Sequence, residues 1–227
     1  MTKQNDPARR QRPWLVAAAA ALALSGVAVS VTGTRAADAG RRQQTPAEVS
    51  RSAPQARPAT TAAGIKNFGR VNENYYRGAQ PGAEGMAELK RLGVKTVIDL
   101  RKDRVRDAAG WAEAAGLKYV NLPLVASRPA TEAETEQFLG LVNDPANQPV
   151  FVHCKGGRHR TGALTAVFRI THDGWTADRA FEEMLKYDFN KGGLFGGGGG
   201  RARQKQFVYD FYARHSATAE RAGAARQ

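Results

Sequence analysis

Apolar positions follow two different periods along the middle of the chain. Short apolar runs of strand length are separated by stretches with helical spacing, and three of these runs lie at 94–100, 117–122 and 149–152. Before them, residues 68–77 alternate around an Asn-Glu-Asn turn, which predicts a hairpin or an edge strand. Strands that alternate with helices predict an α/β fold with a mostly parallel central sheet and helices on both faces.

Capping residues and glycines mark the ends of the expected helices. These markers are the capping box of Thr131 and Glu134, the N-cap Thr176, and the terminal glycines Gly93 and Gly116. The predicted helices cover roughly 83–92, the stretch from the charged turn 101–106 to Gly116, 131–142, the stretch from Thr161, 176–187, and an amphipathic helix around 207–212. The glycine-rich run from Gly192 to Gly200 predicts a mobile loop between the last two helices.

The first 64 residues have a different character from the rest of the chain. A polar start with three arginines precedes about eighteen mostly apolar residues, 14–31, and small residues follow. We interpret 1–39 as an export signal with a cleavage site before Gly40, or as an uncleaved membrane anchor through 14–31. This predicts a periplasmic, extracytoplasmic or membrane-anchored protein. A flexible linker over 40–64, a single domain over 65–216 and a frayed tail over 217–227 complete the expected organisation.

Composition narrows the classes of function. The formal net charge is +13, shared as +6 in the first 64 residues and +7 in the remainder. The basic residues are scattered without an interleaved aromatic platform, so no nucleic-acid partner is predicted. There is one cysteine, which excludes an intramolecular disulfide, and the four histidines show no zinc-ligand spacing. The sequence therefore predicts neither a metal nor another cofactor.

The stretch 149–162 carries the strongest chemical signal. An apolar strand leads into a loop that contains two glycines, and helical spacing begins at Thr161. The N–H groups of such a loop and of the following helix N-terminus lack helical partners, so they form a site for anions. Cys154 opens the loop and Arg160 closes it. These donors favour the thiolate, and Thr161 can donate a hydrogen bond to the sulfur.

This stretch resembles the signature His-Cys-x5-Arg-Thr-Gly of the cysteine-dependent protein tyrosine and dual-specificity phosphatases. Every fixed position is present, and the string is most similar to the atypical dual-specificity group of plants, fungi and bacteria. The resemblance implies a phosphatase fold and hydrolysis of phosphate monoesters through a phosphocysteine. It implies catalytic roles for Cys154 and Arg160, supporting roles for His153 and Thr161, and substrate binding by Lys155, Gly156, Gly157, Arg158, His159 and Arg160.

The residue that protonates the leaving group stays open at this point. In the family it is often an aspartate on the loop after the strand that precedes the capping-box helix, but the corresponding loop 122–130 has no carboxylate. The candidates considered instead are Glu132, Glu134, His159 and Asp188. We expect Glu134 to cap its helix and His159 to orient the loop. Asp99 is expected to be a structural hydrogen-bonding residue. Arg77 is expected to be a surface or structural residue, with a position facing the site as the alternative.

Several functions remain compatible with the loop. The expected partner is a phosphorylated protein or a small phosphorylated substrate. Lys155, Arg158 and His159 make the mouth of the loop strongly cationic, which favours substrates with several phosphates such as inositol phosphates or pyrophosphates. A phosphate-binding module with little turnover is an alternative. A rhodanese-type sulfurtransferase also uses a cysteine loop, but the Arg-Thr-Gly ending argues against it.

Overall fold

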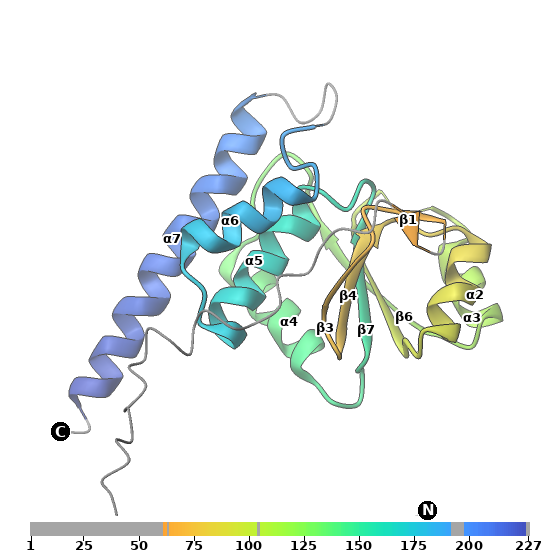
Figure 1. The fold of residues 1–227 in the computed structure, drawn as a ribbon, viewed down its shortest axis with the longest axis horizontal. Coiled ribbons are helices and arrows are strands. Elements are labelled where there is room, and N and C mark those ends of the chain that lie inside the picture. The colour runs from red at the N-terminus through yellow and green to blue at the C-terminus, as the bar shows by residue number, and fades with distance from the viewer. Residues whose placement is uncertain (1–60, 63, 104, 192–197, 226–227) are drawn as a thin grey trace, which may run out of the picture. The chain divides into compact units, whose positions relative to one another are not determined.

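The computed structural model describes residues 61–62, 64–103, 105–191 and 198–225 (Figure 1). The predicted export signal or anchor, nearly all of the predicted linker and most of the glycine run lie outside these residues. In the described part of the chain, no helix is long and apolar enough to cross a membrane.

A five-stranded sheet forms the centre of the fold. Its strands follow the order β3-β4-β7-β5-β6. β3 and β4 pair in an antiparallel hairpin, and β4, β7, β5 and β6 are parallel to one another. The bounds are β3 Gly69–Asn72, β4 Tyr75–Ala79, β5 Thr96–Arg101, β6 Lys118–Leu124 and β7 Val150–Cys154. The predicted hairpin and the mostly parallel sheet are confirmed.

Helices cover both faces of this sheet. The helices α2 (Ala83–Arg91) and α3 (Ala108–Ala114) share one apolar cluster, which includes Phe151 of β7. On the other face, α4 (Glu132–Asn143) and α5 (Arg160–Asp173) pack in a cluster that includes Val150 and Val152. Successive residues of β7 therefore point into two different cores, as expected for a strand buried on both faces.

Two helices form an outer layer against α5. These are α6 (Ala177–Lys186) and α7 (Gly198–Ala224), which share a third apolar cluster with α5 (Figure 1). The capping signals are confirmed: Thr131 and Glu134 form a reciprocal capping box, and the Thr176 side chain accepts a hydrogen bond from the N–H of Arg179. The two terminal glycines, Gly93 and Gly116, have φ values of 83° and 68°.

The structure differs from the sequence interpretation at both ends of the domain. The first element in the described residues is β1 (Thr61–Ala62), which pairs antiparallel with β2 (Ile65–Lys66) inside and just after the expected linker. At the other end, α7 starts at Gly198, inside the glycine run that was expected to be a loop, and continues to Ala224, where a frayed tail was expected. Residues 217–224 are rich in alanine and contain Glu220 and Arg221, all of which have high helix propensity.

Candidate active site

The loop after β7 lies at the carboxyl edge of the parallel sheet. β7 is the middle strand of five, flanked by β4 on one side and β5 on the other. His153 and Cys154 end the strand, and Arg160 is the first residue of α5. Ligands of α/β sheets bind outside the carboxyl ends of the strands, so the topology brings the predicted residues to the expected edge.

Cys154 lies beneath the loop and is 4% exposed. Burial raises the pKa of its thiol, but the opposing influences are larger together, so the pKa lies below its ordinary value. The hydroxyl of Thr161 and the guanidinium of Arg160 favour the thiolate, and so do the backbone N–H groups of Thr161 and Gly156. The oxygen of Thr161 is buried without an oxygen or nitrogen partner that would compete for its proton. The site therefore favours a negatively charged sulfur.

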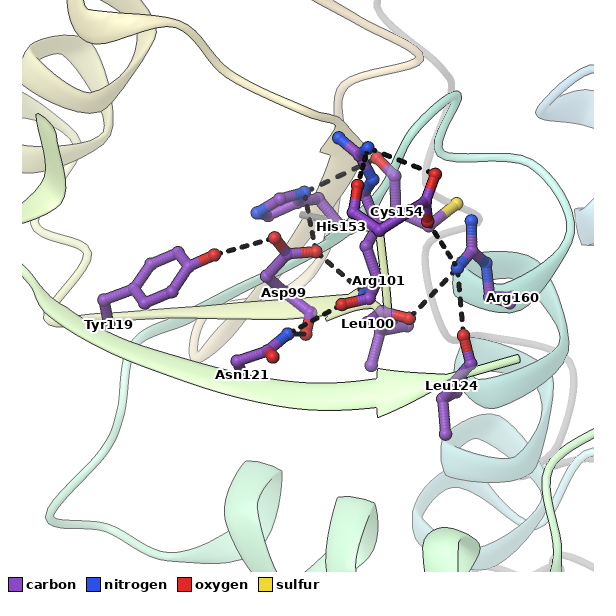
Figure 2. Close-up of polar contacts among 10 residues, drawn as sticks. Asp99, Leu100, Arg101, Tyr119, Asn121, Leu124, His153, Cys154 and Arg160 are labelled. Atoms are coloured by element: carbon purple, nitrogen blue, oxygen red, sulfur yellow. Dashed lines mark hydrogen bonds and ion pairs between the residues drawn. The ribbon is translucent and has the colours of Figure 1, made fainter. Parts of the chain in front are cut away.

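Arg160 is anchored by two strand ends. Its Nη1 donates to the carbonyl of Leu124 at 3.1 Å and to that of Leu100 at 3.4 Å (Figure 2). Within the described residues, no hydrogen bond uses Nε or Nη2. This edge of the guanidinium is therefore available for the two-pronged contact that arginine makes with a phosphoryl group.

His153 is fully buried and neutral. Burial lowers its pKa to about 4, although the nearby carboxylate of Asp99 acts in the opposite direction. Nδ1 of His153 donates to the carbonyl of Cys154 at 3.4 Å and lies 3.8 Å from Oδ1 of Asp99. Asp99 also accepts hydrogen bonds from the N–H of Arg101 and the hydroxyl of Tyr119 (Figure 2). Asp99 is thus structural, as predicted, and it positions the histidine beside the nucleophile.

Two side chains, one from the turn between β2 and β3 and one from β4, hold the carbonyls of the loop glycines. Nδ2 of Asn67 donates to Gly156 at 2.9 Å, and Nη2 of Arg77 donates to Gly157 at 2.8 Å. Arg77 is fully buried, and its guanidinium stacks over the ring of Tyr187 at 3.8 Å. Because C=O and N–H point in opposite directions in a trans peptide unit, fixing these carbonyls directs the N–H groups to the opposite side. The predicted structural role of Arg77 therefore includes the loop itself.

Gly157 has a conformation that only glycine adopts easily. Its φ is +65°, and a Cβ atom here would lie 2.4 Å from the carbonyl carbon of Gly78 and 2.6 Å from the nitrogen of Ala79. Gly156 has no such restriction, because the nearest atom to its Cβ would be 3.7 Å away on Arg158. One of the two predicted loop glycines is thus required by the backbone.

A comparison with known families agrees with this geometry. The model of a family described as "DSP-PTPase phosphatase fused to NAD+ Kinase" matches residues 59–206. The chain belongs to this family of dual-specificity protein tyrosine phosphatase domains. The predicted resemblance to the dual-specificity phosphatases is confirmed.

Individual relatives agree with the family. The chain is 38% identical to the dual specificity protein phosphatase TpbA of Pseudomonas aeruginosa (strain UCBPP-PA14) over 54% of this chain and 55% of the relative. It is 29% identical to the inositol diphosphatase SIW14 of Saccharomyces cerevisiae over 63% and 50%. The crystal structure of P. aeruginosa TpbA superposes with a TM-score of 0.55 at 30% identity and covers 72% of this chain and 99% of that one. The chain spans about half the length of the curated relatives it matches.

None of the four acid candidates predicted for this phosphatase domain makes a hydrogen bond or ion pair to Cys154 or Arg160 in the described part of the chain. Glu134 accepts two hydrogen bonds from Arg128, at 2.7 and 2.8 Å. The hydrogen bond from Arg128 lowers its pKa to about 2, so Glu134 is deprotonated at neutral pH. Glu132 lines a groove between α4 and α7.

The other two candidates are Asp188, which lies in the segment after α6, and His159, which contacts that segment. Nζ of Lys191 lies 3.0 Å from Oδ1 of Asp188. Nε2 of His159 donates to the carbonyl of Phe189 at 3.0 Å, and its ring packs edge-on against the Phe189 ring. Burial lowers the pKa of His159. The prediction that His159 orients the loop fits these contacts.

One carboxylate near Arg160 was missed by the sequence interpretation. Oδ1 of Asp103 lies 3.7 Å from Nη1 of Arg160, and its Oδ2 lies 3.4 Å from Nη2 of Arg101. Asp103 follows β5, the strand beside β7, and had been counted only as part of a charged turn. Its position after a parallel strand was the signal that could have found it.

Proposed function

We propose that this chain is a cysteine-dependent phosphatase that hydrolyses phosphate monoesters through a phosphocysteine intermediate. The main support is the combination of a buried Cys154 thiol with a lowered pKa and an anchored Arg160 with one free edge. The names of the relatives, a dual specificity protein phosphatase and an inositol diphosphatase, support the same type of reaction.

The reaction has two steps. The thiolate of Cys154 attacks phosphorus in line, and an S–P bond forms as the bond to the leaving oxygen breaks. Arg160 and the loop N–H groups hold the three equatorial oxygens, where charge must be stabilised. Water then attacks the phosphocysteine and releases inorganic phosphate. The hydroxyl of Thr161 stabilises the thiolate that leaves in this second step.

The remaining loop residues support this chemistry in different ways. His153 is neutral and shapes the end of β7, so it does not deprotonate Cys154. Gly157 permits the positive φ that the loop requires, and the backbone N–H of Gly156, which favours the thiolate, would also hold the phosphate. In our proposal, the positive charges of Lys155 and Arg158 lie at the rim and attract further anionic groups of the substrate.

For the substrate, we propose a phosphorylated protein side chain or a small molecule with several phosphates. TpbA has been crystallised in complex with pTyr, and SIW14 is named an inositol diphosphatase. Lys155 is exposed, and Arg158 is half-buried with Nη1 donating to the carbonyl of Lys191 at 3.4 Å. Inositol polyphosphates should therefore inhibit or be cleaved at low salt, and Lys155→Met should weaken this effect while leaving phenyl phosphate turnover nearly unchanged.

The activity is tested with para-nitrophenyl phosphate. The full chain should release para-nitrophenol, and Cys154→Ser should release none while still binding vanadate or phosphate. A wild-type chain that binds these anions but shows no turnover on aryl or inositol phosphates would support the phosphate-binding alternative. Turnover of thiosulfate and cyanide would support a sulfurtransferase.

We also propose that the chain acts outside the cytoplasm, either released after cleavage or anchored through residues 14–31. The support is the basic start, the apolar stretch and the small residues Ala37-Asp38-Ala39 in the sequence. This is tested by separating the cells into membrane and soluble fractions and sequencing the N-terminus of the protein found in each. A chain that begins at Gly40 indicates cleavage, an intact chain in the membrane fraction indicates an anchor, and an intact chain in the cytosol contradicts export.

A further inference from the structure

We propose that Asp103, brought beside Arg160 by the turn after β5, is the general acid and base of this phosphatase. The inference rests on the proposed function, because it assigns a proton donor to the same reaction. An oxygen leaving group such as tyrosine, with a pKa near ~10, departs poorly as an anion, so a side chain must protonate it. Within the described residues, none of the four candidates considered from the sequence makes a hydrogen bond or ion pair to Cys154 or Arg160.

Position is the first argument for Asp103. Within the described residues, it is the only carboxylate within 4.0 Å of the guanidinium of Arg160. Its backbone is also held, because Nη2 of Arg101 donates to the carbonyl oxygen of Asp103. The Arg101 side chain is only 8% exposed, so it supports Asp103 from the protein interior. The carboxylate is therefore fixed at the carboxyl edge of the sheet, where the substrate must bind.

Exposure is the second argument. The side chain of Asp103 is 68% exposed, in contrast to the buried Cys154 and Arg160. Because the nucleophile attacks in line, the leaving oxygen points away from the sulfur and toward solvent. A carboxylate that contacts Arg160 on one side and solvent on the other can reach the leaving oxygen and donate a proton to it. The exposed side also lets protons exchange with water.

The charges around Asp103 explain how its carboxyl group can hold a proton once the substrate is bound. Burial raises the pKa of Asp103, but its own backbone N–H group and the cations Arg101 and Arg160 outweigh this, so the pKa is low in the free protein. A bound phosphoryl group takes up the charge of Arg160 and brings negative charge of its own. Both effects favour the protonated carboxyl group. Substrate binding would thus favour the form of Asp103 that can donate a proton.

The proton balance covers both steps. In the first, the S–P bond forms, the bond from phosphorus to the leaving oxygen breaks, and the carboxyl proton of Asp103 moves to that oxygen. In the second, the Asp103 carboxylate accepts a proton from the attacking water as the new P–O bond forms and the S–P bond breaks. The products are the alcohol or phenol, inorganic phosphate and the original thiolate.

An inhibitory role for Asp103, in which it only competes with phosphate for Arg160, makes a different prediction. If Asp103 only occupies Arg160 and competes with phosphate, its neutralisation would improve substrate binding. Asp103→Asn would then raise kcat/KM for every substrate. If Asp103 is the acid, the same change lowers kcat/KM most for substrates whose leaving groups need protonation.

The test compares para-nitrophenyl phosphate with phenyl phosphate in the full chain. Because kcat/KM reports steps through the first P–O cleavage, Asp103→Asn should lower it about 100-fold for phenyl phosphate, within the range that acid catalysis supplies. The loss for para-nitrophenyl phosphate should be at least about tenfold smaller, because its leaving group is a stabilised anion. Asp103→Glu should recover part of the phenyl phosphate activity.

A matched control is available four residues further along, at the N-cap of α3. Asp107 is exposed and makes no side-chain capping bond to α3, so Asp107→Asn removes the same charge without touching Arg160. It should leave both substrates nearly unchanged. An equal loss on both substrates in Asp103→Asn, no loss on either, or a rise on both overturns the inference. A wild-type chain without activity, or an active Cys154→Ser, overturns the proposed function instead.

Discussion

Replacing Gly157 with alanine tests whether the loop has the conformation on which the proposed catalysis depends. The left-handed conformation, with φ of +65°, costs an alanine about 1–2 kcal/mol. The new Cβ atom would also lie 2.4 Å and 2.6 Å from backbone atoms of Gly78 and Ala79. Those atoms belong to β4, which pairs with β7, so they cannot move aside without disturbing the sheet.

The loop must therefore move, and this breaks a buried hydrogen bond. The carbonyl of Gly157 accepts from Nη2 of Arg77, whose Nε and Nη1 have no partner in the described residues. Losing a hydrogen bond to a buried charged group costs about 1.5–3 kcal/mol. We expect Gly157→Ala to lower the free energy of unfolding by about 3–5 kcal/mol. The displaced N–H donors should lower kcat/KM at least about 100-fold.

The measurements are urea unfolding and turnover of para-nitrophenyl phosphate. Gly156→Ala is the matched control, because its Cβ atom would meet nothing closer than 3.7 Å and its φ is not positive. It should change the unfolding free energy by less than about 1 kcal/mol and leave turnover within a few-fold. A Gly157→Ala protein that unfolds and turns over like the wild type would refute the reasoning.

Three further predictions concern the surroundings of the loop. Arg77→Met should weaken vanadate inhibition at least about tenfold, because the Gly157 carbonyl loses its donor; an unchanged inhibition constant would contradict this. Thr161→Val should raise the pKa of Cys154, measured as a shift to higher pH in the rate of alkylation by iodoacetamide, since the hydroxyl favours the thiolate; an unshifted profile would show that it does not. Because burial lowers the pKa of His153 from 6.5 to about 4, the folded chain disfavours its protonation. The associated stability is complete above pH 6.5 and is lost as the pH falls toward 4, by up to about 3 kcal/mol. The urea-unfolding free energy of His153→Asn should depend less on pH in this range, and an identical slope would refute the assignment.

The core of the site was predictable because its signal is local. Cys154 and Arg160 are separated by five residues, and the strand, the loop and the helix that position them are contiguous in the sequence. The capping box at Thr131 and Glu134 is equally local, and it was found. Such features depend on neighbouring backbone groups alone, so the residue pattern is sufficient to predict them.

Contacts between distant segments were harder to predict. Arg77 could be assigned a structural role, but its bond to Gly157 depends on the pairing of β4 with β7. The tail after residue 216 was expected to fray, as the ends of domains commonly do. The alanine-rich composition of residues 217–224 is instead sufficient for α7 to continue to Ala224.

The acid was missed because sheet order is not visible in the sequence. The family pattern places the acid on the loop after β6, which is the edge strand and does not pair with β7. β5 does pair with β7, and Asp99 lies opposite His153 in that register. The turn that follows β5 therefore reaches the cysteine loop directly and brings Asp103 to Arg160. The end of β6 also reaches the site, because the carbonyl of Leu124 accepts a hydrogen bond from Arg160, but the residues that follow it up to Ala130 include no carboxylate. A carboxylate after β5 can therefore replace the aspartate that the loop after β6 lacks.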